Sequence, residues 1–143
     1  MEKIDCKGLY IYKDKKFVPY ELTNSKTIMC GIPGAFTDGC TKKHLPGFAN
    51  ALDYLKEKGI DKVVFVGVND PIVMDVWNKQ HGHKDIDSVS DPLAVFTKRI
   101  KKDEDWGDSF GVRCSRYAYL IEEGKIVKEF KNPFIEGVLQ EIW

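Results

Sequence analysis

Residues 62–68, with the sequence KVVFVGV, form an almost unbroken apolar run. A run without polar alternation fits a strand that is covered on both faces, as in a parallel sheet flanked by helices. A second apolar run of strand length, TIMCGI, covers residues 27–32. Between them, residues 37–59 carry apolar side chains at three-and-four spacing, which predicts an amphipathic helix that ends at Gly59. Pro46 should kink this helix near its first turns.

The flanking segments complete an α/β pattern. Residues 9–20 predict two short strands around a charged turn, and the polar stretch KKDEDWGDS at 101–109 predicts a surface loop. We also expect helices over 71–81, 92–100 and 135–143, a short strand over 88–90, and a hairpin of 117–122 with 126–130 around Glu123-Gly124-Lys125. This order specifies a mixed central β-sheet flanked by helices on both faces, for which a thioredoxin-like fold is the compact solution.

Composition narrows the class of protein. With 143 residues and 43% hydrophobic content, the chain can build one core, so we expect a single domain over 1–143. Lys and Arg number 22 and Asp and Glu also number 22, which gives no net attraction to nucleic acid or anionic lipid. No apolar segment reaches the length of a membrane span or a secretory h-region. We therefore expect a soluble, cytoplasmic protein with small-molecule partners.

The turn P33-G-A-F-T-D-G-C40 holds the most informative residues, because it joins a buried strand to a helix at the carboxyl edge of the sheet. With Thr37 as the N-cap, Cys40 is the third helical residue, and the Thr37 hydroxyl lies close to its sulfur. Unpaired backbone N–H groups and the positive helix end then favour a thiolate. A peroxidase also needs donors, such as a hydroxyl or a guanidinium, that orient the peroxide and stabilise the leaving oxygen.

These residues resemble a known family. Pro33, Thr37 and Cys40 match the P-x-x-x-T-x-x-C signature of peroxiredoxins, and GIPGAFTDGCTKKHLPGF at 31–48 is similar to the active-site segment of their type II, or fifth-class, branch. The resemblance covers nearly the whole chain and continues through VGVND at 66–70, Trp77, SDP at 90–92, and GVRCSRYAYLIEEGKIV at 111–127.

The resemblance implies a thiol-dependent, antioxidant peroxidase without a cofactor. Cys40 would attack the O–O bond of hydrogen peroxide or an organic hydroperoxide and become a sulfenic acid, which an external thiol then reduces. Pro33 would shield Cys40, Thr37 would hydrogen-bond the sulfur and the peroxide, and Arg116 would be the distant catalytic arginine. Glutathione, glutaredoxin and thioredoxin are the reductants that the family suggests, and a homodimer is expected.

Two further residues near this site have open interpretations. Arg116 begins an alternating strand with Ala118 and Leu120 on its own face, so it should be partly buried and need an anion. From the residues alone, a structural carboxylate is the commoner partner, and only the resemblance favours a catalytic role. His44, four residues after Cys40, either supports the thiolate electrostatically or is an ordinary hydrogen-bonding residue.

The chain departs from the family at Asp38, where relatives usually carry proline. A negative charge beside Cys40 opposes thiolate formation, which puts the reaction rate in doubt. The usual resolving cysteines are also missing, because no cysteine follows Cys114 and the 62–68 strand carries Phe65. A one-cysteine cycle is therefore favoured.

The other three cysteines lack C-x-x-C or zinc-like spacing, and Cys40 with His44 gives too few ligands for a metal. We expect Cys30 to be a buried, inert residue and Cys6 to be exposed near the N-terminus. Cys114 would share a strand face with Arg116, which makes it the one speculative resolving cysteine.

Two other functions fit part of the pattern. A thioredoxin-like thiol:disulfide oxidoreductase shares the fold and the position of the nucleophile, but the chain lacks its C-x-x-C partner. A non-enzymatic redox sensor or binding module, in which Cys40 oxidises slowly, is the second alternative. The rate of peroxide consumption distinguishes both from a peroxidase.

Overall fold

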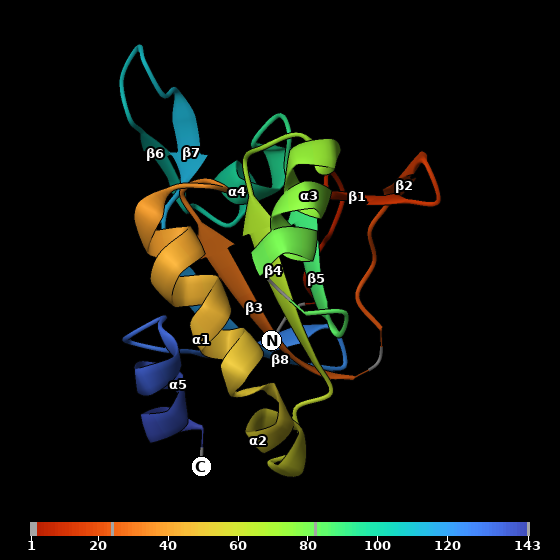
Figure 1. The fold of residues 1–143 in the computed structure, drawn as a ribbon, viewed down its shortest axis with the longest axis vertical. Coiled ribbons are helices and arrows are strands. Elements are labelled where there is room, and N and C mark those ends of the chain that lie inside the picture. Colours follow the sequence, from red (N-terminus) through yellow and green to blue (C-terminus); the bar gives the residue numbers. More distant parts are fainter. Residues whose placement is uncertain (1–2, 24, 82, 143) are drawn as a thin grey trace.

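The computed structural model describes residues 3–23, 25–81 and 83–142 and has one seven-stranded sheet with helices packed against it (Figure 1). The strands are β1 (Tyr10–Lys13), β2 (Lys16–Pro19), β3 (Lys26–Ile32), β4 (Lys62–Gly67), β5 (Ile86–Ser90), β6 (Asp103–Asp105), β7 (Val112–Cys114), β8 (Tyr117–Glu122) and β9 (Lys125–Glu129). The helical elements are η1 (Cys40–His44), α1 (Leu45–Asn50), α2 (Leu52–Glu57), α3 (Pro71–His81), α4 (Val95–Arg99) and α5 (Ile135–Glu141).

The strand order in the main sheet is β2-β1-β5-β4-β3-β8-β9. The three central strands β3, β4 and β5 are parallel, whereas β8 and β9 on one side and the β1–β2 hairpin on the other are antiparallel. The mixed central sheet and the thioredoxin-like fold predicted from the sequence are confirmed. Because β3, β4 and β5 run in the same direction, the segments that follow them meet at one edge of the sheet.

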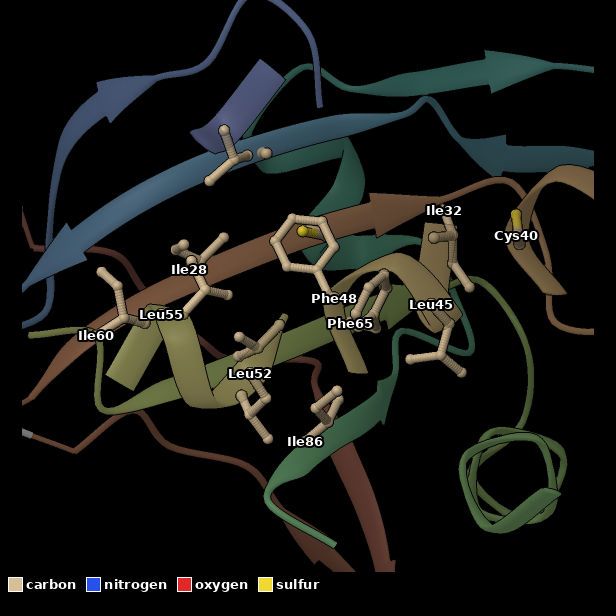
Figure 2. Close-up of a cluster of buried hydrophobic side chains, with 14 of the residues drawn as sticks. Ile28, Ile32, Cys40, Leu45, Phe48, Leu52, Leu55, Ile60, Phe65 and Ile86 are labelled. Atoms are coloured by element: carbon tan, nitrogen blue, oxygen red, sulfur yellow. The ribbon is translucent and has the colours of Figure 1, made fainter. Parts of the chain in front are cut away.

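Alternation along the central strands creates two hydrophobic clusters, one on each face of the sheet. On β3, Ile28, Cys30 and Ile32 face the first cluster, whereas Met29 faces the second. Residues of α1, α2, α3 and α5 pack in the first cluster, and Figure 2 shows Cys40 at the end of this cluster, beyond Ile32. The second face is covered by α4 and the N-terminal segment. The helices are thus divided unequally between the two faces.

One expectation about an individual element was wrong, and another is confirmed with interruptions. The helix predicted over 37–59 is helical from residue 38 to Glu57 but is divided into η1, α1 and α2, and Gly59, in the left-handed region, follows its end as expected. The stretch 101–109 is exposed, but it contains strand β6, which pairs with β7 in a projecting hairpin (Figure 1). Charged residues with low strand propensity hid this pairing.

The interruption before Pro46 has a direct physical cause. Proline has no N–H to donate to residue 42, and its ring would crowd that carbonyl in a regular α-helix. The chain instead forms one wide π-helical turn at η1, in which the Leu45 N–H donates to the carbonyl of Cys40. The irregularity predicted near Pro46 is therefore present. Among the described residues, no helix combines the length and the apolar character needed to cross a membrane.

Candidate active site

Cys40 lies at the start of the helix that follows β3, at the carboxyl edge of the sheet. Residues 38 and 39 are already helical, and the Thr41 N–H donates to the Thr37 carbonyl at 2.9 Å, so Thr37 is the N-cap residue as predicted. Cys40 is 0% exposed and packs with Ile32 in the first cluster. Access to the sulfur therefore requires movement of the side chains that cover it.

The turn before Cys40 is fixed by its own hydrogen bonds. The Thr37 hydroxyl donates its proton to the carbonyl of Gly34 at 2.6 Å, and not to Cys40. The lone pairs of this hydroxyl oxygen are the part left to accept a hydrogen bond from a ligand. Pro33 is buried immediately after β3. The catalytic roles of Thr37 and Pro33 stay predictions.

Two residues that the sequence analysis did not single out support this turn, because Asn69 bonds it directly and Arg113 holds the segment that carries Asn69. The side-chain oxygen of Asn69 accepts a hydrogen bond from the Ala35 N–H at 2.8 Å. Arg113 donates from Nη1 to the Val68 carbonyl at 3.0 Å, and its guanidinium lies over the Phe110 ring at 3.9 Å. Asn69 belongs to the VGVND segment quoted above, which was the available signal.

Arg116 reaches the sulfur across 76 residues of sequence. It precedes β8 and points to the face of Ala118 and Leu120, as predicted. Its Nη2 donates to Cys40 Sγ at 3.2 Å, and its Nη1 lies 2.7 Å from His44 Nδ1. Within the described ranges, no carboxylate pairs with Arg116. Its positive charge is therefore left for the sulfur and for any anion that forms there.

His44 holds Arg116 in place rather than adding charge. Because a guanidinium only donates, His44 Nδ1 must accept, and the proton is assigned to Nε2, which donates to the Pro133 carbonyl at 3.0 Å. Burial first, and then the neighbouring Arg116 charge, lower the pKa of His44 from 6.5 to about 3. His44 is therefore neutral near physiological pH, so its support of the site comes through Arg116 and not through a positive charge.

The C-terminal segment also contributes to the site, which the sequence reasoning missed. The Phe134 ring centroid lies 4.9 Å from Arg116 Cζ and 4.5 Å from Lys43 Nζ. No sequence motif indicates that residues 133 and 134 return to this helix.

The helix that carries Cys40 also contacts α3, because the Thr41 hydroxyl accepts a hydrogen bond from Trp77 Nε1 at 3.0 Å.

Cys114 and Cys40 belong to different hydrophobic clusters, on opposite faces of the sheet. Cys114 belongs to the second cluster, so the expectation that it shares a face with Arg116 was wrong. β7 ends at Cys114 and β8 begins at Tyr117, so the alternation of a single strand does not apply across residues 115 and 116. Burial raises the pKa of Cys114 to about 12, which keeps it a thiol.

The remaining cysteines make no hydrogen bond to Cys40 or Arg116 among the contacts of the described residues. Cys30 is buried as expected, and burial raises the pKa of its thiol far above the usual range. Cys6 is half-buried, where exposure was expected, and lines a surface cavity of about 720 Å³ with Tyr20 and Leu22, apart from the Cys40 site. Within the described ranges, no group of three or more His, Cys, Asp or Glu side chains has a metal-binding arrangement.

Asp38 points into solvent beside a lysine. Its Oδ1 lies 3.6 Å from Lys42 Nζ, and the two side chains are 89% and 77% exposed. Solvent and the lysine both weaken the field that this carboxylate exerts on the sulfur. The cost expected from Asp38 is accordingly small.

Comparison with known proteins agrees with this geometry. The profile of the Redoxin family matches residues 13–141. Peroxiredoxin-2C of Oryza sativa is 38% identical over 103 residues, covering 71% of this chain, and peroxiredoxin Pen c 3 of Penicillium citrinum is 39% identical over 114 residues, covering 78%. The chain spans 64% and 65% of these relatives' lengths. The crystal structure of reduced Prx3 in complex with H₂O₂ from Vibrio vulnificus superposes with a TM-score of 0.92 at 27% identity, covering 99% of this chain and 97% of that chain.

The chain therefore belongs to the redoxin family. Within that family its relatives are peroxiredoxins of the type II-like branch, which confirms the resemblance seen in the sequence.

Proposed function

We propose that this chain is a thiol-dependent peroxidase in which Cys40 reduces hydroperoxides. The observation that carries the proposal is the 3.2 Å contact between Arg116 Nη2 and Cys40 Sγ, made by a guanidinium without a carboxylate partner among the described residues. An unneutralised cation beside a buried sulfur stabilises negative charge that develops next to it. A structural arginine would instead be expected to hold a carboxylate.

The first half-reaction transfers one oxygen atom. The Cys40 thiolate attacks the terminal oxygen of ROOH, an S–O bond forms, and the O–O bond breaks. The leaving RO⁻ takes a proton and departs as ROH, or as water when the substrate is hydrogen peroxide. Cys40 is oxidised to the sulfenic acid, and the peroxide is reduced by the same two electrons.

The side chains have separate roles in this step. Arg116 stabilises the developing charge on the leaving oxygen, and the free lone pairs of the Thr37 hydroxyl accept a hydrogen bond from the peroxide and orient it. Asn69 fixes the turn that carries Thr37 by accepting from the Ala35 N–H, and Arg113 holds the segment of Asn69 through the Val68 carbonyl. Pro33 helps to keep water from the sulfur. Because Cys40 is covered, hydrogen peroxide should react faster than a bulky hydroperoxide.

The second half-reaction uses external thiols. One thiol condenses with the sulfenic acid to give a mixed disulfide and water, and a second thiol releases Cys40 as a thiol with formation of an external disulfide. The placement of Cys114 and Cys40 in clusters on opposite faces of the sheet supports this one-cysteine cycle. The reductant is glutathione, glutaredoxin or thioredoxin, and supplying each in turn to the oxidised protein identifies it.

A stopped-flow measurement of peroxide consumption tests the proposal. Wild-type protein with a thiol reductant should consume peroxide over many turnovers, and Cys40→Ser should consume none while it keeps its circular dichroism spectrum. Disulfide reduction without peroxide turnover would instead favour a thiol:disulfide oxidoreductase. Oxidation of Cys40 only once and slowly would favour a sensor.

We also propose a cytoplasmic homodimer. Phe36, Ile72 and Leu93 are large exposed apolar side chains on the segments that follow β3, β4 and β5, and parallel strands bring these segments to one edge. Leu93 is 77% exposed, so Leu93→Asp should shift sedimentation toward a monomer. Four unpaired cysteines support a reducing compartment, which cell fractionation can test.

A further inference from the structure

Three consecutive residues of the C-terminal segment contact the helix that carries Cys40. The Pro133 carbonyl accepts the bond from His44 Nε2, and the Phe134 ring lies 4.9 Å from the His44 ring. Ile135 begins α5 and packs so closely on α1 that a Cβ at Gly47 would lie 2.9 Å from its Cγ2. Figure 1 shows α5 beside α1. The segment is thereby fixed against the helix at successive positions.

Phe134 lies where it can act on the guanidinium of Arg116. The ring centroid is 4.9 Å from Arg116 Cζ, within the distance of about 6 Å at which the negative face of an aromatic ring attracts a cation. A ring quadrupole attracts the cation without neutralising it, whereas a carboxylate would cancel much of its field. Arg116 thus has two uncharged partners, the His44 imidazole and the Phe134 ring.

We propose that Phe134 is a positioning residue for the peroxidase reaction, which holds Arg116 against Cys40. The Phe134 ring shields the Arg116 guanidinium from water and leaves the charge of the guanidinium undiminished. This inference rests on the proposed function and adds a residue from outside the motif segments to it. Without the Phe134 ring, the guanidinium keeps its hydrogen bond to His44, but the Arg116 side chain can adopt other rotamers. Its charge then spends less time beside the sulfur and the leaving oxygen.

The test compares Phe134→Leu with Phe134→Tyr, which retains the π face. Phe134→Leu should lower the second-order rate constant for peroxide about threefold to thirtyfold, the range to which cation–π energies correspond. Phe134→Tyr should stay within about twofold of wild type, since its ring offers the same attraction. Phe17→Leu is the matched control, because Phe17 is 58% exposed on β2 at the opposite side of the sheet. It should react like wild type.

A double-mutant cycle shows whether Phe134 acts through Arg116. In an Arg116→Ala background, Phe134→Leu should cause no further loss. The proposal is overturned if Phe134→Leu reacts like wild type, if Phe134→Tyr is as slow as Phe134→Leu, or if the two losses multiply. Phe134→Met, which also lacks a π face, replaces the leucine variant if that variant does not fold.

Alkylation of Cys40 by iodoacetamide separates this inference from the proposed function. Because Phe134 holds the Arg116 cation against the sulfur, Phe134→Leu should be alkylated more slowly than wild type and Phe134→Tyr should not. A wild-type protein that fails to reduce peroxide would refute the proposed function, and the alkylation rates would still decide the role of Phe134. Equal alkylation rates in all variants would refute that role alone.

Discussion

Replacing His44 with phenylalanine should make the protein less sensitive to acid. The imidazole is buried between Arg116 and the Pro133 carbonyl, and its pKa falls from 6.5 to about 3 on folding. Between these values the unfolded chain binds a proton at this position and the folded chain does not. Stability contributed by the neutral imidazole is therefore fully present above pH 6.5 and is lost as the pH falls toward 3.

The size of the stability loss follows from the pH interval between the unfolded and folded pKa values of His44. Each pH unit between the two values costs about 1.4 kcal/mol, so about 3 kcal/mol should be lost between neutral pH and about pH 4.5. His44→Phe keeps the ring volume and lacks the titrating group. At neutral pH the variant should be less stable than wild type, because the Arg116 donor and the Pro133 carbonyl lose their partner. That deficit should shrink by about 3 kcal/mol on acidification to about pH 4.5.

Urea unfolding of both proteins at the two pH values measures the difference. An equal loss of stability in wild type and variant would refute the neutral, buried assignment of His44. The wild-type protein provides an independent check by nuclear magnetic resonance. The ring protons of His44 should not shift between pH 8 and about 4.5, and a titration near pH 6.5 would contradict the tautomer assigned from the hydrogen bonds.

Three other substitutions test the site. Arg116→Ala should slow peroxide reduction by about 10² to 10³, as expected for a preorganised electrostatic donor, and an unchanged stopped-flow rate constant would make Arg116 structural. Cys114→Ser should leave the rate of peroxide reduction unchanged. Oxidised wild-type protein without reductant should accumulate sulfenic and then sulfinic acid at Cys40, and a stoichiometric Cys40–Cys114 disulfide in the mass spectrum would overturn the one-cysteine cycle. Asp38→Asn should change the rate of peroxide reduction by less than about twofold, because Lys42 and solvent screen the carboxylate. A large increase in this rate would show that the field of the Asp38 carboxylate reaches the sulfur.

Local sequence signals predicted the central sheet and the position of Cys40 in the fold. The continuous apolar run at β4 and the turn from β3 into the helix placed Cys40 correctly, because burial on both faces and helix capping are properties of short segments. The sequence also predicted the face of Arg116 correctly, because the alternation of side chains between Arg116 and Ala118 is likewise a property of a short segment.

The remaining parts depend on contacts between distant segments. Phe134 lies 18 residues beyond Arg116 and reaches it only because α5 packs on α1 at Gly47. The neutral state of His44 depends on burial and on Arg116, neither of which its neighbours in sequence reveal. Cys114 was assigned to the wrong face because β7 and β8 are separate strands.

In the proposed reaction, Cys40 accepts the oxygen atom from a peroxide. To examine this step, reduced protein is mixed with one equivalent of hydrogen peroxide, sulfenic acid is trapped with dimedone, and the adduct is mapped by mass spectrometry. Wild-type protein should consume peroxide rapidly and stoichiometrically and carry the adduct on the Cys40 peptide, and Cys40→Ser should carry no adduct. Peroxide that is consumed at the same rate by Cys40→Ser, or an adduct on Cys6, Cys30 or Cys114 in place of Cys40, would refute this role of Cys40.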